Sequence, residues 1–292
     1  KIIIYIYMKN KKLIILVIIT TIIVITGLLY YLYINNSGIE LNIKDDDIII
    51  VNNPYIENRS LKWIDIENSF MKNNWPNTFD FDYEIKKDLL KNALKMPENH
   101  GIIDCGAHIG DGSIPLAHAL KHNNRSDIIV YAIDPSKYKC DFIEYMKKIN
   151  NLDNLIVLNY GLSDRDNIEY TYSSNSDWEA SKNTGGISWE PFKDKTNSIN
   201  RGYLNSKDDN IFIKLDTLFN KNIIKHKIGV IHLDVEGMED KAIIGGINYI
   251  SDNKPYISLE DHTNNTTMFE NLLKNKYKNI KKININYIYT SN

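Results

Sequence analysis

The stretch from Asp104 to Gly112, DCGAHIGDG, holds the residues whose types and spacing are best suited to bind a cofactor. It follows the apolar pair Ile102-Ile103 and precedes 113–122, which has the composition of a helix. Glycines reach backbone conformations with positive φ, and a helix start offers unpaired N–H groups to a ligand. A strand, such a turn and a helix start, in that order, predict a cradle for an adenosine-containing cofactor.

The spacing of the glycines narrows the kind of cofactor. The motif reads acid-x-Gly-x-x-x-Gly, whereas an NAD-dependent oxidoreductase would show Gly-x-Gly-x-x-Gly, because a pyrophosphate must touch that turn. The spacing suits the methionine part of S-adenosyl-L-methionine. We therefore predict that this cofactor is bound by Asp104, Gly106, Ala107, His108 and Gly110. An ordinary tight turn between a strand and a helix is the alternative.

A second apolar segment, 128–133, ends in Asp134, one helix and one strand beyond the glycine turn. An acid at this place can hold both hydroxyls of a ribose. Asp134 could also cap the helix that follows Pro135, because Asp is a good N-cap, and the two roles are compatible. A third apolar run is closed by Ser163 and Asp164, which we add to the predicted cofactor site.

Two further predicted strands, 229–234 and 255–260, also end in acids. The carboxyl ends of parallel strands gather at one edge of a sheet, and ligand sites lie there. We therefore expect five acids along this rim, namely Asp104, Asp134, Asp164, Asp234 and Glu260.

Strands and helices alternate over 81–292, which predicts one α/β domain: a mostly parallel sheet with right-handed crossovers and helices on both faces. Residues 166–210 interrupt this rhythm with many polar residues and two tryptophans. An insertion of this length is either a disordered loop or a lid over a site, and the tryptophans favour a lid-like insertion.

The composition limits the possible partners. Net charge is −2, and the four arginines are scattered without a basic stripe, so we expect no nucleic acid partner. Hydrophobic residues make up 43% of the 292 residues, enough for a packed core. The two cysteines, Cys105 and Cys140, have no metal-ligand spacing and are predicted to be free thiols.

Residues 13–34 carry no charge and are almost wholly apolar. As a helix they would span about 33 Å, which predicts a transmembrane anchor. Three lysines precede the segment and acids follow it, so the positive-inside rule puts 1–12 in the cytoplasm and the main domain across the membrane. Residues 35–80 would be a stalk or linker. A cleaved signal peptide is the alternative, although no small-x-small cleavage site follows.

Taken together, these motifs resemble the FkbM-type S-adenosylmethionine-dependent methyltransferases over about residues 85–290. The most specific part is 232–239, HLDVEGME, and 215–218, LDTL, also contributes. The resemblance implies a Rossmann-like methyltransferase fold and O-methylation, often of sugars or small natural products. Two positions depart from the family pattern: His232 stands where Lys is common, and Asp134 where Glu is common.

A hydroxyl that receives a methyl group must lose its proton, and a positioned base contributes about 10²–10⁴-fold to the rate. We predict three catalytic residues: Asp234 at the strand nearest the reacting methyl, Glu236 on the next turn, and His262 beyond the fifth strand. Glu236 could instead hold the turn, and His262 could be a solvated loop residue.

Asp234 could alternatively hold the cofactor's ammonium group. With Glu260 it could also hold Mg²⁺ and an acceptor diol, but no tight ligand spacing demands a metal and none is predicted. The leading interpretation is a membrane-anchored O-methyltransferase for a glycan or small hydroxylated acceptor. The alternative is a non-catalytic scaffold that keeps the cofactor pocket.

Overall fold

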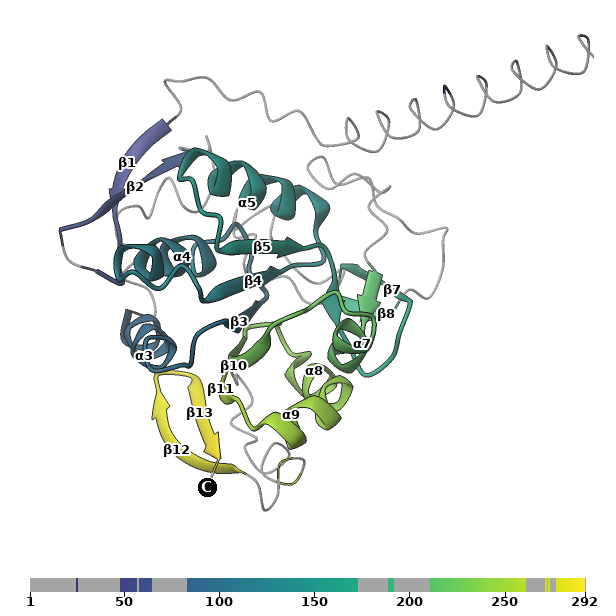
Figure 1. Ribbon diagram of the computed structural model, residues 1–292. Coiled ribbons are helices and arrows are strands. Elements are labelled where there is room, and N and C mark those ends of the chain that lie inside the picture. Colours follow the sequence, from purple (N-terminus) through teal and green to yellow (C-terminus); the bar gives the residue numbers. More distant parts are fainter. Residues whose placement is uncertain are drawn as a thin grey trace, which may run out of the picture. The chain divides into compact units, whose positions relative to one another are not determined.

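The computed structural model describes residues 48–56, 58–64, 83–172, 189–191, 211–260 and 277–291, with Ile25, Asn271 and Leu273 (Figure 1). All of these residues except Ile25 belong to one compact unit, 43–292. The predicted anchor, 13–34, lies outside the described residues except for Ile25, and so does His262. Among the helices that the structure describes, none combines the length and the apolar character needed to cross a bilayer.

A seven-stranded sheet in the order β12-β13-β11-β10-β3-β4-β5 forms the centre of this unit. Neighbours from β11 to β5 pair in parallel, and β13 pairs antiparallel with both β11 and β12. The strands are β3 (His100–Cys105), β4 (Ile129–Ile133), β5 (Leu155–Leu158), β10 (Lys227–Leu233), β11 (Tyr256–Glu260), β12 (Tyr277–Ile283) and β13 (Asn286–Ser291). The predicted mostly parallel sheet is confirmed.

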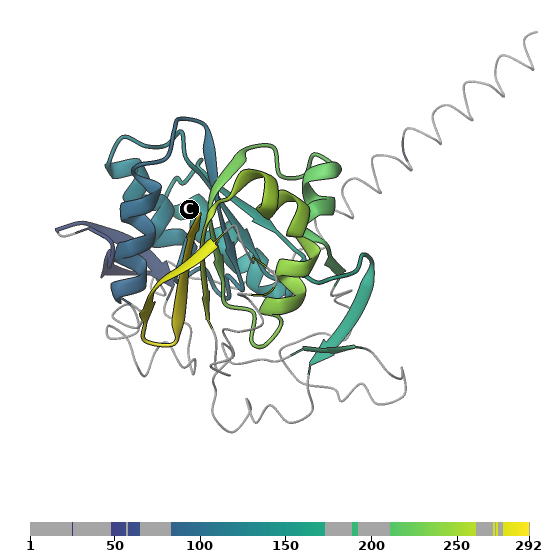
Figure 2. The ribbon, with the colours of Figure 1, turned by 90° about the horizontal axis from the view of Figure 1, so that it is seen from below.

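Helices cover both faces of the sheet, with α3, α4 and α5 on one side and α7, α8 and α9 on the other (Figure 2). The first group comprises α3 (Tyr83–Ala93), α4 (Ser113–His122) and α5 (Lys137–Ile149), and the second α7 (Leu215–Asn220), α8 (Glu239–Gly245) and α9 (Ile247–Asn253). Helix α4 occupies the predicted range 113–122. This arrangement is the Rossmann-like fold that the family resemblance implied.

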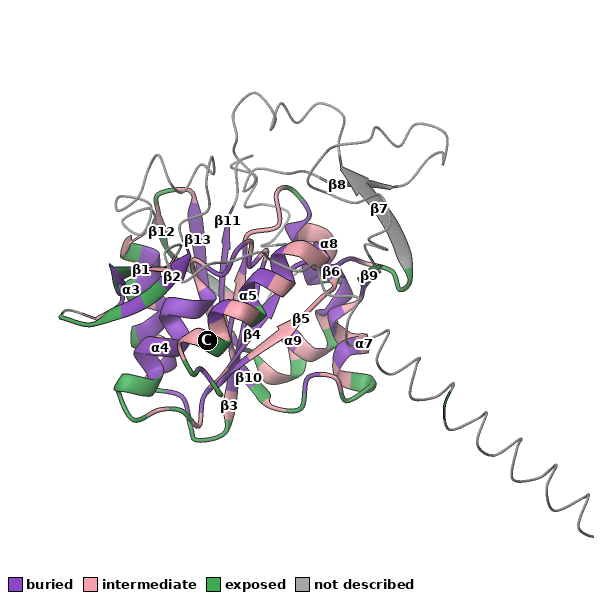
Figure 3. Cartoon of the chain, turned by 90° about the horizontal axis from the view of Figure 1, so that it is seen from above, coloured by how far each residue is buried: buried purple, intermediate pink, exposed green. Residues whose placement is uncertain are grey.

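The central strands are apolar on both faces because helices cover both faces. Ile102 and Ile103 of β3, which as neighbours in a strand point to opposite sides, are each at most 1% exposed. Buried residues gather on the central strands and on the inner sides of the helices (Figure 3). Each fully buried isoleucine of this kind stabilises the fold by about 1.5–3 kcal/mol. The resulting core fixes the carboxyl ends of β3, β4 and β10, and therefore the loops that follow them.

Local hydrogen bonds and turns shape two parts of the C-terminal half. Helices α8 and α9 meet at Gly246, where Asp216 accepts hydrogen bonds from the N–H groups of Asn248 and Tyr249. This carboxylate starts a new helix because it satisfies the free N–H groups of the first turn. The last two strands, β12 and β13, form an antiparallel hairpin that turns at Asn284, whose φ is 54°.

Part of the predicted stalk packs against the domain. Residues 48–64 contain an antiparallel hairpin of β1 (Ile48–Asn52) and β2 (Ser60–Ile64). Trp63 is 1% exposed, and its ring meets the edge of Phe142 on α5 at 6.0 Å between centroids. A short hairpin of this kind is stable only when its apolar face packs against another part of the protein. The sequence pattern did not reveal that α5 provides this surface.

The insertion contributes to a second, smaller sheet with the order β6-β9-β7-β8. Its strands are β6 (Gly161–Leu162), β7 (Ile168–Tyr172), β8 (Trp189–Pro191) and β9 (Ile211–Ile213). Residues 173–188 and 192–210 lie outside the described residues, so the lid-like role of the insertion stays a prediction.

Candidate functional site

A pocket opens at the carboxyl ends of β3, β4 and β10, and it encloses about 450 Å³ of space that is partly open to solvent. Gly106 and His108 line it from the glycine turn, Asp134 from the end of β4, and Asp234 and Glu236 from the end of β10. Five of the predicted site residues therefore surround one space.

Gly106 lies where no side chain fits. Its φ is +81°, and a Cβ atom there would stand 1.6 Å from the backbone oxygen of Asp234. The Gly106 N–H donates to the Ile133 oxygen at 2.9 Å, and the Asp234 N–H donates to the Cys105 oxygen at 2.9 Å. The turn is thus held between β4 and β10, which brings the backbone of both loops against the pocket.

Asp134 is buried, and both of its carboxylate oxygens accept backbone hydrogen bonds. Oδ2 accepts the N–H of His108 at 3.0 Å, and Oδ1 accepts the N–H of Ser136 at 2.8 Å. The N-cap of α5 is Ser136 itself, so Asp134 holds the turn before the cap. Each carboxylate oxygen can accept a second hydrogen bond, so the carboxylate can also serve a ligand in the pocket.

The remaining predicted residues of the glycine motif, Asp104, Ala107 and Gly110, are not among the residues that line the pocket. Asp104 is 7% exposed, and its Oδ2 accepts the hydroxyl of Ser113 at 2.6 Å at the start of α4. Burial raises the pKa of Asp104, and His232 and the Ser113 hydrogen bond oppose that rise. Ala107 and Gly110 are joined by a hydrogen bond of 2.7 Å from the Gly110 N–H to the Ala107 oxygen. These residues brace the turn.

His108 and Asp111 form a local pair at the mouth of the turn. Nδ1 of His108 lies 3.5 Å from Oδ1 of Asp111, and both side chains are partly exposed. Burial alone would raise the pKa of Asp111, but the hydrogen bond from His108 and the charge of Lys86 lower it to about 2. Asp111 is therefore a carboxylate at neutral pH and helps to orient the His108 ring.

Ser163 and Asp164 stand behind the pocket wall. The backbone oxygen of Ser163 lies against α8, where a Cβ on Gly245 would come within 2.0 Å of it, and the Ser163 hydroxyl donates to Asp164 Oδ1 at 3.1 Å. The lining from this segment comes from Gly161 and Leu162. A cofactor role for Ser163 and Asp164 remains a prediction.

An apolar wall that sequence reasoning missed completes the pocket. Phe212 of β9 lies against Gly161, where a Cβ would come within 2.2 Å of the ring. Leu162, Val235 and Met238 join it in lining the pocket. Phe212 follows the insertion, far in sequence from the glycine motif, so only the pairing of β9 with β6 could reveal its place.

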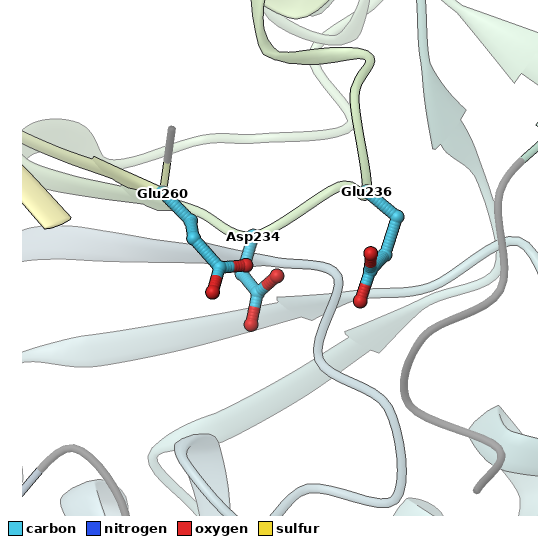
Figure 4. Close-up of side chains that lie close together, drawn as sticks. All are labelled: Asp234, Glu236 and Glu260. Atoms are coloured by element: carbon cyan, nitrogen blue, oxygen red, sulfur yellow. The ribbon is translucent and has the colours of Figure 1, made fainter. Parts of the chain in front are cut away.

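Three carboxyl groups gather beyond the end of β10. Asp234, just past the end of β10, lies beside Glu260 at the end of β11, and Glu236 points into the same space from the next turn (Figure 4). One oxygen from each lies within 4.8 Å of the others. Burial raises the pKa of Asp234, and its hydrogen bond with Glu260 adds to the rise.

Glu236 adopts a strained backbone conformation with φ of 51°, and such strain is typical of functional sites. The same turn is also held by a neighbouring glutamate. Oε1 of Glu239 accepts the N–H groups of Val235 at 3.0 Å and Gly237 at 3.3 Å. Glu239 therefore stabilises the turn, and Glu236 lines the pocket.

Comparison with known proteins places this site in a family. Residues 104–282, more than half of the chain, match the methyltransferase FkbM domain. The chain belongs to the FkbM methyltransferase family. This membership confirms the predicted family and the predicted cofactor, S-adenosyl-L-methionine. Comparison with curated protein sequences finds no match.

Several solved methyltransferases are similar to this FkbM-family chain. Methyltransferase FkbM from Methylobacillus flagellatus aligns with a TM-score of 0.40 and 14% identity, over 66% of this chain and 44% of that one. For precorrin-6y C5,15-methyltransferase from Geobacter metallireducens the TM-score is 0.35 and the identity 13%, over 86% and 97%. For a tRNA methyltransferase from Pyrococcus abyssi, in complex with S-adenosyl-L-homocysteine, the TM-score is 0.37 and the identity 12%, over 84% of this chain and 44% of that one. The chain thus spans less than half of the Methylobacillus protein.

Proposed function

We propose that this chain is a membrane-anchored O-methyltransferase that transfers the methyl group of S-adenosyl-L-methionine to a hydroxyl of a glycan or another small acceptor. The observation that carries the proposal is the joint lining of one pocket by Gly106, Asp134, Asp234 and Glu236. Residues predicted to bind the cofactor and carboxylates that can accept a proton thus line the same pocket, as a methyl-transfer reaction requires.

The geometry of the pocket supports the following roles in cofactor binding. Asp134 would hold the ribose hydroxyls with the second lone pairs of its oxygens. The turn at Gly106 and His108 would support the methionine part, because the missing side chain lets a ligand approach the backbone. The flat ring of Phe212 and the side chain of Leu162 offer an apolar wall suited to the adenine.

The catalytic step forms a bond between the acceptor oxygen and the methyl carbon while the bond from carbon to sulfur breaks. The sulfur keeps the electron pair, and the hydroxyl proton leaves to a base. Asp234 and Glu236 are the described carboxyl groups that line the pocket from β10, so one of them would take that proton. His262, which we predicted as a base, lies outside the described residues, and its role stays a proposal.

The anchor at 13–34 and the orientation with residues 1–12 in the cytoplasm are part of the proposal. They rest on the uncharged apolar run and the lysines before it. S-adenosylmethionine is made in the cytosol, so a domain on the other side of the membrane would depend on imported cofactor. Alkaline extraction and protease protection of membranes test the anchor and the orientation, and full release into the soluble fraction would contradict the anchor.

Calorimetry and a transfer assay on the full-length chain in detergent test the activity. We expect S-adenosyl-L-homocysteine to bind, and methyl-labelled cofactor to transfer its label to a hydroxylated acceptor from a glycan panel. Asp234→Asn should lower turnover about 10²–10⁴-fold, because it cannot accept the proton. The control is Asp153→Asn, which removes an exposed carboxylate before β5.

The outcomes separate the candidate functions. Binding of S-adenosyl-L-homocysteine without transfer to any acceptor would support a scaffold. Binding of NAD in place of it would contradict the cofactor assignment. Equal turnover of Asp234→Asn and wild type would remove Asp234 from the mechanism.

A further inference from the structure

We propose that Asp234, Glu236 and Glu260 bind one divalent metal cation at the edge of the cofactor pocket. This differs from the sequence-based expectation that no metal is held. Cation binding itself is independent of the proposed function, whereas the use of the ion in methyl transfer rests on it.

The spacing of the carboxyl oxygens suits a single ion. One oxygen from each residue lies within 4.8 Å of the others. Three oxygens spread evenly around one ion stand about 4.0–4.5 Å apart for Ca²⁺ and about 3.5–3.6 Å apart for Mg²⁺, given the usual ligand distances. The three side chains are therefore close to the spacing for Ca²⁺, and binding of the smaller Mg²⁺ requires them to close by up to about 1 Å.

A second, independent observation is the buried amide of Asn286. It is 2% exposed, and its Oδ1 has no hydrogen-bond partner. Asn286 on β13 is the register partner of Glu260 on β11, so both side chains stand on the same face of the sheet with Cβ atoms about 4.5–5.5 Å apart. An amide oxygen is a hard ligand of the kind that Mg²⁺ and Ca²⁺ prefer.

Two more buried polar atoms without a hydrogen-bond partner belong to the same face. These are Nδ1 of His232 and Oγ of Ser258, which are register partners on β10 and β11. His232 comes two residues before Asp234, and Ser258 two residues before Glu260. A buried polar group without a partner costs about 1–3 kcal/mol. The concentration of such groups here indicates a polar site built for a hydrated ion, whose water ligands can hydrogen-bond to these atoms.

The ion would also explain why three carboxyl groups crowd one place. Three carboxylates at this spacing repel one another in a partly buried site, and a divalent cation offsets that repulsion. If the proposed function holds, a cation there can bind the acceptor oxygen as a Lewis acid and lower the pKa of its hydroxyl. The chain's own contribution is to fix the ion at the mouth of the cofactor pocket.

Electron paramagnetic resonance with Mn²⁺ tests the site, because bound Mn²⁺ loses the sharp signal of the free ion. The full-length chain in detergent is titrated with Mn²⁺ without any cofactor, and Mg²⁺ and Ca²⁺ are added as competitors. We expect one Mn²⁺ per chain, and at least tenfold weaker binding in Glu260→Gln and in Glu236→Gln. Glu98→Gln makes the same chemical change at an exposed position and should bind like wild type.

S-adenosyl-L-homocysteine binding is measured on the same samples by calorimetry. A variant that loses Mn²⁺ but keeps this binding is folded and supports the cation site. Absence of Mn²⁺ binding up to millimolar concentration, or equal binding in wild type and both glutamate variants, would overturn the proposal. If the wild-type chain does not bind S-adenosyl-L-homocysteine, that result would instead count against the proposed function.

Discussion

Substitution of Gly106 by alanine tests how the cofactor turn is built. Gly106 and Gly237 both have positive φ, +81° and +90°, and flank the same pocket. A Cβ at Gly106 would stand 1.6 Å from the Asp234 backbone oxygen, whereas a Cβ at Gly237 would meet no atom within 4 Å. Comparing the two alanine variants therefore separates the cost of the clash from the cost of the backbone conformation.

The expected magnitudes follow from these contacts. Positive φ costs an alanine about 1–2 kcal/mol, and this is the whole expected loss for Gly237→Ala. In Gly106→Ala the Asp234 carbonyl must also retreat, which strains the packing by about 1–3 kcal/mol. The hydrogen bond of 2.9 Å from the Asp234 N–H to the Cys105 oxygen weakens as well. That loss adds about 1 kcal/mol. We therefore expect a total of about 3–6 kcal/mol for Gly106→Ala.

Urea unfolding followed by tryptophan fluorescence measures both free energies of unfolding, and calorimetry measures S-adenosyl-L-homocysteine binding. We expect Gly106→Ala to bind S-adenosyl-L-homocysteine at least tenfold more weakly than Gly237→Ala, because the retreat of the Asp234 backbone moves this residue away from the pocket. Equal stability and equal affinity of the two variants would refute the packing described for this turn.

Two further predictions concern His118 and Glu239. Burial, with the neighbouring His122, lowers the pKa of His118 to about 4, so between pH 6.5 and 4 the unfolded chain binds a proton that the folded chain does not. As the pH falls through this window, the free energy of unfolding should decrease by up to about 1.4 kcal/mol per pH unit. His118→Gln should make this decrease smaller when the free energy is measured by urea titration at several pH values. The same pH dependence in His118→Gln and wild type would contradict the role of His118. Glu239→Ala should lower the free energy of unfolding by about 2–3 kcal/mol, because it leaves two backbone N–H groups unpaired. Glu239→Gln keeps an acceptor oxygen and should lower it by less than about 1 kcal/mol in the same assay. Equal losses in the two variants would contradict this role of Glu239.

The local elements were accessible to sequence reasoning. Helix α4 spans the predicted 113–122, and the predicted strands ending near Asp134, Asp234 and Glu260 all occur. These segments are apolar runs bounded by turn residues. The spacing of apolar residues along the sequence indicates which side of a helix or strand is buried. The two cysteines are free, as expected.

The roles of neighbouring residues within a motif were less accessible. Asp104 and Gly106 stand two positions apart, yet the first braces α4 and the second lines the pocket. Glu236 and Glu239 divide in the same way between pocket and turn. Which carboxylate faces a ligand depends on backbone dihedrals at single residues, such as φ of 51° at Glu236, and the residue types do not encode those angles.

The sequence by itself determined the order of strands and helices, the glycine turn and the set of acids at the strand ends, because hydrophobic period and turn chemistry are local properties. Tertiary structure alone decided that Phe212 forms a pocket wall, that the hairpin at 48–64 packs on α5, and that Asn286 stands beside Glu260. Each of these is a contact between distant segments, fixed by strand register and by the burial of whole faces, and no short stretch of sequence contains that information.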